Sequence, residues 1–145
     1  MKTVKEIAVK LENKPGTLSG VGDLLGANGI HVLGLTLRTD GDVGTLNLIA
    51  ADPDRAVSVL ESGGYAPAVR EVIAAEAPQH YGGLNTVLKA LKLADVNVEH
   101  LYSCTGVHGS SDATILVLGV DKLKAAHDAL AAEWIQLYGD ELYSL

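Results

Sequence analysis

Two glycine-containing segments carry the residues of this chain that are best suited to bind a small polar ligand. The first is Asn13-Lys14-Pro15-Gly16-Thr17-Leu18, and the second is Tyr81-Gly82-Gly83-Leu84. Because glycine has no side chain, the backbone N–H groups can approach a ligand closely, and the start of a following helix attracts an anion. The amide of Asn13 can both donate and accept, which matches the ammonium and carboxylate of a free amino acid. A tight turn without a ligand is the alternative interpretation.

The two segments belong to an internal repeat. Gly16 and Gly82, Leu25 and Leu91, and Val32 and Val98 each stand about 66 positions apart, and further apolar pairs share this offset. The repeat predicts two domains, residues 1–70 and residues 71–145. Two copies of one small fold have an internal interface, and such an interface can form a pocket that neither copy has alone.

Hydrophobic periodicity and turn residues predict the same order of elements in both copies: strand, helix, strand, strand, helix, strand. Asp52-Pro53 and Asp121 are expected to cap the second helix of each copy, and Asn28-Gly29 to end the first helix. We therefore predict an α+β fold of two tandem ferredoxin-like βαββαβ units with antiparallel sheets, side by side. The expected strands and helices of the second copy are 71–76, 83–93, 96–103, 113–120, 122–132 and 134–138.

Two details of the strand patterns add to this prediction. The apolar parity changes within the second strand of each copy, at Gly34 and at His100, which indicates a β-bulge at both places. The third strands are apolar on both parities, as in residues 115–118, which indicates burial on both sheet faces. Since helices cover one face, we expect a second molecule to cover the other and predict a homodimer.

Composition excludes several classes of function. The net charge is −7 with scattered basic residues, and aromatic residues make up 4% of the chain, so a nucleic-acid partner is not expected. No apolar run is long enough to span a membrane and no signal-peptide pattern opens the chain, so we expect a cytoplasmic protein. The single cysteine, Cys104, cannot form an internal disulfide.

The first loop and its spacing resemble a known family. Leu11-Glu12-Asn13-Lys14-Pro15-Gly16-Thr17-Leu18, with Gly29-Ile30-His31-Val32 after one helix, resembles the signature of ACT domains, and the loop is similar to the serine-sensing loop of phosphoglycerate dehydrogenase. The whole chain is similar to small proteins made of two tandem ACT domains. The resemblance implies a non-catalytic regulatory protein that binds an amino acid at the interface of its two domains, without a cofactor, and reports to an enzyme or transcription factor.

The resemblance also implies which residues form the site. Asn13 matches the loop asparagine that holds the polar end of the ligand, and Asn97, between Val96 and Val98, matches an asparagine supplied by the neighbouring domain. His31 stands where the first copy would have Asn97, and Gln79-His80-Tyr81 replaces the Asn-Lys-Pro stretch in the second copy. One good site per chain is therefore expected, and the opposite site is expected to be altered.

Other functions remain as alternatives. A structural or oligomerisation adaptor needs no ligand, and a small enzyme of the acylphosphatase type would need an arginine in the first loop, where none is found. A nucleotide sensor of the PII type would need a longer loop than residues 40–43. His100, Cys104 and His108 have a spacing that could reach a metal, but a surface hairpin with ordinary histidines is favoured, so no metal site is predicted.

Overall fold

The computed structural model describes residues 1–108 and 113–145, which form two compact units. The N-terminal unit comprises residues 5–70, and the C-terminal unit comprises residues 71–145 together with residues 1–4. Residues 109–112, which fall in the longer hairpin expected in the second copy, lie outside the described residues. Each unit has its own α+β architecture and its own hydrophobic core.

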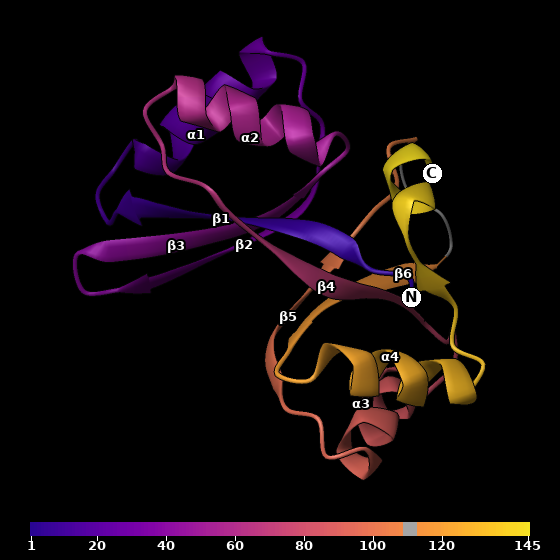
Figure 1. The fold of residues 1–145 in the computed structure, drawn as a ribbon. Helices are drawn as coiled ribbons and strands as arrows, with labels where there is room; N and C mark the ends of the chain where they lie inside the picture. Colours follow the sequence, from indigo (N-terminus) through magenta and orange to yellow (C-terminus); the bar gives the residue numbers. More distant parts are fainter. Residues whose placement is uncertain (109–112) are drawn as a thin grey trace. The chain divides into compact units, whose positions relative to one another are not determined.

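In the N-terminal unit two helices cover one face of an antiparallel sheet (Figure 1). The strands lie in the order β2-β3-β1. Their alternate apolar residues, such as Ile7, Val9, Leu46 and Leu48, form a buried core with the helices. Because alternate residues of a strand lie on the same face, these side chains all point toward the helices. The elements are β1 (Val4–Glu12), α1 (Thr17–Ala27), β2 (Val32–Asp40), β3 (Val43–Ala50) and α2 (Pro53–Ser62), followed by β4 (Ala68–Ala77), which continues into the C-terminal unit.

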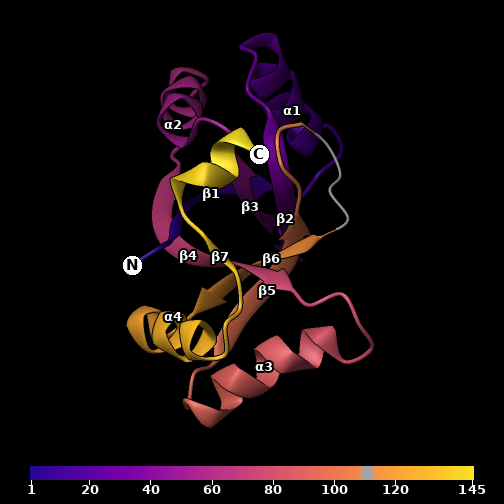
Figure 2. The ribbon, with the colours of Figure 1, turned by 90° about the vertical axis from the view of Figure 1, so that its right-hand side faces the viewer.

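The C-terminal unit repeats this plan, with α3 and α4 on one face of its sheet (Figure 2). Its strands pair in the order β5-β6-β4-β7, all antiparallel. The chain ends in a short 3₁₀ helix, η1 (Asp140–Ser144), whose Leu142 is fully buried. The remaining elements are α3 (Gly83–Leu93), β5 (Val98–Cys104), β6 (Thr114–Val120), α4 (Leu123–Ala132) and β7 (Leu137–Tyr138). Within the described ranges, no helix is long and apolar enough to cross a membrane.

The two expected β-bulges are confirmed. The pairing of β2 with β3 shifts register between Val32 and Gly34, and the pairing of β5 with β6 shifts between Val98 and His100. At the second bulge the ring of His100 lies directly over Gly119, where a Cβ atom would overlap it. The parity change in the sequence therefore has the cause expected for it, one extra residue in each second strand.

Helix ends confirm most of the capping predictions and correct one. Asp52 caps α2 by accepting the N–H of Arg55 at 3.2 Å, and Gly29 follows α1 with a φ of +68°. The prediction for Asp121 was wrong, because α4 begins after Lys122, which makes no side-chain cap. The carboxylate of Asp121 instead accepts the N–H of Asn97 at 2.9 Å, so it ties β6 to the start of β5.

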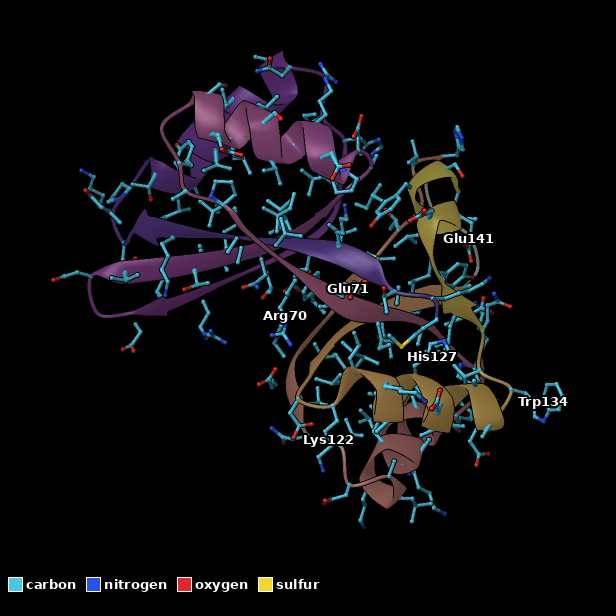
Figure 3. All side chains as sticks on the ribbon, in the orientation of Figure 1. Arg70, Glu71, Lys122, His127, Trp134 and Glu141 are labelled. Atoms are coloured by element: carbon cyan, nitrogen blue, oxygen red, sulfur yellow. The ribbon has the colours of Figure 1, made fainter. Side chains whose placement is uncertain are left out.

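Two strands of the second copy differ from the prediction, whereas β4 begins at Ala68 and runs through Arg70 and Glu71 without a break (Figure 3), so no linker separates the two copies. The strand expected over 134–138 is reduced to β7, because Trp134 has a φ of +59°, outside the strand region. The strand expected over 96–103 begins two residues later, at Val98.

The third strand of the second copy is buried on both parities, as its pattern predicted. All six residues of 115–120 are buried within a single chain. Burial of both faces therefore needs no second molecule, and the argument from sequence for a dimer loses its premise. The homodimer stays a prediction.

Gly83 gives a test of the packing at the start of α3. A Cβ atom at this position would overlap the carbonyl oxygen of Pro78, a contact that only a backbone shift can relieve. We expect Gly83→Ala to lower the free energy of unfolding by about 2 kcal/mol, measured by urea denaturation. Gly22→Ala is the matched control, because nothing lies within 4 Å of its Cβ position. The control should be neutral or stabilising by about 0.5–1 kcal/mol, and equal effects at the two glycines would contradict the prediction.

Candidate functional site

The loop between β1 and α1 is held in one conformation by its own polar groups. Gly16 has a φ of +91°, a left-handed conformation that glycine adopts without strain, and it turns the chain directly into the helix. The hydroxyl of Thr17 donates to the carbonyl oxygens of Glu12 at 2.7 Å and Lys14 at 3.1 Å. Beside them Lys14 Nζ lies 2.7 Å from Glu12 Oε2, and this ion pair lowers the pKa of Glu12 and raises that of Lys14.

The start of α1 has no side-chain cap, and the backbone N–H of Thr17 donates to the carbonyl oxygen of Lys14 at 3.4 Å. Its N-cap residue, Gly16, has no side chain that could accept from the first N–H groups, and its first turn contains no acidic residue. The neighbouring helix α2 differs, since Asp52 caps it and Asp54 lies in its first turn. Uncapped N–H groups at a helix start carry a partial positive charge that an anion can neutralise.

A hollow of about 360 Å³ opens beside this loop in the N-terminal unit. The volume lies in the range of small-molecule sites. Its wall combines both charges of the Glu12–Lys14 pair with the glycines of the helix start and the ring of Tyr65. The lining residues are Lys10, Leu11, Glu12, Lys14, Gly16, Thr17, Gly20 and Tyr65.

The other residues of the first loop lie around the hollow but do not line it. The side-chain amide of Asn13 donates to the carbonyl oxygen of Gly41 at 2.8 Å, and its backbone N–H donates to that of Asp42 at 2.8 Å. Asn13 thus ties the loop to the turn between β2 and β3. Pro15 and Leu18 are exposed.

The second loop has a similar backbone and different side chains. Gly82 precedes α3 with a φ of +83°, and α3 likewise has no side-chain cap. Gly83 is buried under Pro78, whereas Tyr81 is fully exposed and Leu84 is half exposed. His80 is exposed, and its Nδ1 lies 2.9 Å from the carbonyl oxygen of Tyr81.

The ligand-binding residues expected at the start of each second strand are described here within their own units. Val96 belongs to the core of the C-terminal unit, and Val98 packs against that core. Asn97 is exposed, with its backbone paired to Asp121. His31 is exposed in the N-terminal unit, and its carbonyl oxygen accepts the N–H of Ala51 at 2.9 Å, the same backbone position that Asn97 occupies against Asp121.

The C-terminal unit has hollows at the equivalent place, beside the β4–α3 loop. One has about 380 Å³ and another, along α3, has about 450 Å³; both include Thr86 and Glu133. Trp134, at the end of α4, is 95% exposed and projects outward (Figure 3). The first of these hollows is lined by Glu76, Ala77, Pro78, Gln79, Thr86, Glu133, Trp134, Ile135 and Gln136.

Sequence reasoning missed several residues that line the first hollow. Lys10, Leu11 and Tyr65 were not proposed as site residues, since only the fold brings the segment after α2 to the start of α1. A signal existed at Gly20, a glycine inside a helical pattern, which indicates close packing by a neighbour. The neighbour is Tyr65, whose hydroxyl lies 3.5 Å from the Cβ position of Gly20.

The described residues were compared with what a metal site and a reactive thiol would need. Residues 1–108 and 113–145 contain no group of three or more His, Cys, Asp or Glu side chains placed to hold a metal ion. Cys104 is buried, and burial raises the pKa of its thiol to about 11. Thiols react as thiolates, so the native protein holds Cys104 in its unreactive form near neutral pH.

We expect Cys104 to resist a thiol reagent at pH 8 in the native protein and to react completely in urea. Because the folded state favours the neutral thiol, this group's contribution to stability is full below its ordinary pKa of 9.0 and is lost as the pH rises toward 11. The rate at which the reagent labels Cys104 in the native protein, followed by absorbance, tests this resistance. Rapid labelling of the native protein would show that the burial is wrong.

We expect Asn13→Ala to lower the free energy of unfolding by about 0.5–1 kcal/mol, because it removes the hydrogen bond to Gly41. Thermal unfolding should show a decrease of roughly 2–4 °C in Tm. Asn85→Ala, on the exposed surface of α3, is the control and should leave Tm unchanged. An unchanged Tm for Asn13→Ala would mean that the hydrogen bond to Gly41 does not contribute to stability.

Comparisons with known proteins agree with this fold. Protein BT0572 from Bacteroides thetaiotaomicron has a solved structure that is 26% identical, with a TM-score of 0.88 over 99% of this chain and 97% of that one. The regulatory subunit of aspartate kinase from Thermus thermophilus is 16% identical, with a TM-score of 0.64 and 92% coverage of both chains, and this likeness shows the fold alone. No curated protein sequence matches the chain significantly.

The family model gives the assignment. The model of an ACT domain pair matches residues 2–143, nearly the whole chain. The match spans both units, in agreement with the doubled βαββαβ order and the glycine at the start of each first helix. The chain therefore belongs to the ACT domain pair family.

Proposed function

We propose that this protein is a non-catalytic regulatory protein that binds a free amino acid at the β1–α1 loop of its N-terminal unit. The observation that carries the proposal is the uncapped start of α1 beside a hollow that contains an ion pair. A free amino acid presents a carboxylate and an ammonium close together. The helix start and Lys14 suit the first group, and Glu12 suits the second.

Family membership supports the regulatory part of the proposal. The ACT signature implies amino-acid sensing on behalf of an enzyme or a transcription factor, and the loop that carries the signature is the loop beside the hollow. Asn13 would contribute its amide oxygen to the ligand's ammonium, while one N–H of its amide donates to Gly41. The contribution expected of Asn97 stays a prediction.

The acylphosphatase alternative gains no support from the site. Such an enzyme needs a guanidinium in the first loop to hold a phosphate. The described residues that line the hollow include no arginine. Arg55, from α2, donates instead to the carbonyl oxygen of Asn28 at the far end of α1.

We expect free L-amino acids to raise the Tm of the protein, and one or a few to do so strongly. Saturation at one hundred times the dissociation constant adds about 2.7 kcal/mol, which corresponds to roughly 5–10 °C for a chain of this size. A thermal-shift screen of the twenty common L-amino acids, each at about 10 millimolar, measures this change in Tm.

Variants separate binding at this loop from binding elsewhere. Lys14→Ala and Asn97→Ala should each reduce the shift, and Lys92→Ala, on the last turn of α3, should leave it intact. If His31→Ala were damaging and Asn97→Ala harmless, the family asparagine would have been assigned to the wrong strand. A flat screen would favour an adaptor that uses no ligand.

A further inference from the structure

The start of the chain is held between two elements of the C-terminal unit, α4 and η1 (Figure 1). The backbone N–H of Lys2 donates to Nε2 of His127 on α4 at 3.2 Å. The ammonium of the same lysine lies 2.8 Å from Glu141 Oε1 on η1. The side chain of His127 is only 18% exposed, so most of its ring is packed against the unit. We call residues 1–3, which these contacts hold, the N-terminal latch.

The latch leads into β1 through contacts that do not involve a histidine. The hydroxyl of Thr3 donates to Glu71 Oε1 on β4 at 2.9 Å. Val4 is 1% exposed, so apolar burial fixes the chain where β1 begins, and β1 then runs to Glu12 of the candidate site. At the other end Met1, which carries the α-amino group, is exposed. Movement of the latch is therefore limited to the residues before Val4.

The contact with Lys2 requires a neutral imidazole at His127. A ring nitrogen that accepts an N–H carries no proton, so Nε2 is unprotonated and the ring proton is on Nδ1. Nδ1 lies 3.3 Å from Asp128 Oδ1, which can accept from it. In the imidazolium both ring nitrogens are donors, so Nε2–H and the N–H of Lys2 would face each other without an acceptor. Protonation of the ring therefore breaks this contact.

The charged groups around His127 keep the same charge while a histidine titrates. On α4, Asp128 attracts an imidazolium, and Lys124, 2.6 Å from Asp128, offsets part of that attraction. Hydrogen bonds from Lys124 and His127 lower the pKa of Asp128. On η1, the hydrogen bond from Lys2 and backbone hydrogen bonds lower the pKa of Glu141 to about 2. A proton gained by His127 therefore changes the partner of the ring without disturbing either carboxylate.

We propose that His127 is a pH-sensitive switch that releases the N-terminal latch from α4 when the ring becomes protonated. Histidine is the side chain that changes its charge between about pH 5 and pH 8. The hydrogen bond to Lys2 is fully present above the protonation of His127 and is lost as the pH falls through it. The acid form keeps the ring on Asp128 and the ammonium of Lys2 on Glu141, and such an exposed ion pair holds a chain end only weakly. The switch needs no ligand and is separate from the proposed amino-acid site.

Nuclear magnetic resonance on the full chain, with isotope-labelled lysine and histidine, tests the switch. The order parameter of the Lys2 N–H should fall from about 0.85, typical of ordered backbone, to below about 0.6 between about pH 8 and about pH 5. The midpoint of this change should coincide with the titration of the His127 ring. The N–H of Lys10, inside β1, should stay rigid throughout.

Variants assign the response to one histidine. His127→Gln should keep Lys2 rigid at both pH values, because the amide oxygen of glutamine can accept the N–H and gains no charge in acid. His31→Gln, which changes an exposed histidine of the N-terminal unit, is the matched control and should keep the full response. Glu141→Gln should increase the loss of order in acid, since it removes the remaining ion pair. Circular dichroism confirms that each variant is folded.

Three outcomes would overturn the inference. The first is a Lys2 N–H that stays rigid while the ring of His127 titrates. The second is the same loss of order in His127→Gln, which would assign the response to another group, such as Glu71. The third is a His127 ring that gains no proton between about pH 8 and about pH 5.

Discussion

The structure depends on a backbone constraint at the start of the first helix in each copy. Gly16 and Gly82 both adopt a left-handed conformation, which lets the chain pass from strand to helix in a few residues. A side chain at this position would strain that turn. A second consequence is electrostatic: glycine at the N-cap leaves α1 and α3 without a side-chain cap, and neither helix has an acid in its first turn. The feature that shapes the fold thus leaves a polar helix start available for a ligand.

Duplication has kept the framework and changed the surfaces. Both units retain the bulge in the second strand, the glycine turn and the core made by alternate strand residues and two helices. Framework positions are restricted because a core tolerates few changes in volume or polarity. Positions that line the hollows face solvent, so Lys10 and Glu76 can carry opposite charges with little effect on folding. One copy can therefore keep a ligand site while the other loses or alters it.

The ion pair of Glu12 and Lys14 contributes little to the shape of the loop that it belongs to. An exposed pair of this kind adds little to stability, because water screens both charges and the side chains lose freedom when they pair. Thr17 already holds the loop through two hydrogen bonds to backbone oxygens. The loop therefore does not need the ion pair for its shape, and both charges are exposed beside the hollow that they line.

The sequence by itself determined the repeat, the βαββαβ order, the glycine turns, the bulges at Gly34 and His100, and the cap at Asp52. These follow from local rules: period, turn chemistry and parity act over a few residues. Local rules failed at Asp121, where the carboxylate binds the N–H of Asn97, 24 positions away. They also failed for the strand after α4, which the left-handed Trp134 shortens.

Only the tertiary structure decided the composition of the hollow. Tyr65 reaches α1 because the fold brings the end of α2 to that helix, and Lys10 lines the wall because of the register of β1. Asn13 has its partner in Gly41, 28 positions away, which no spacing rule connects to it. Contacts between distant segments depend on how whole elements pack, and the pattern of one element contains no information about the surface that its neighbour presents.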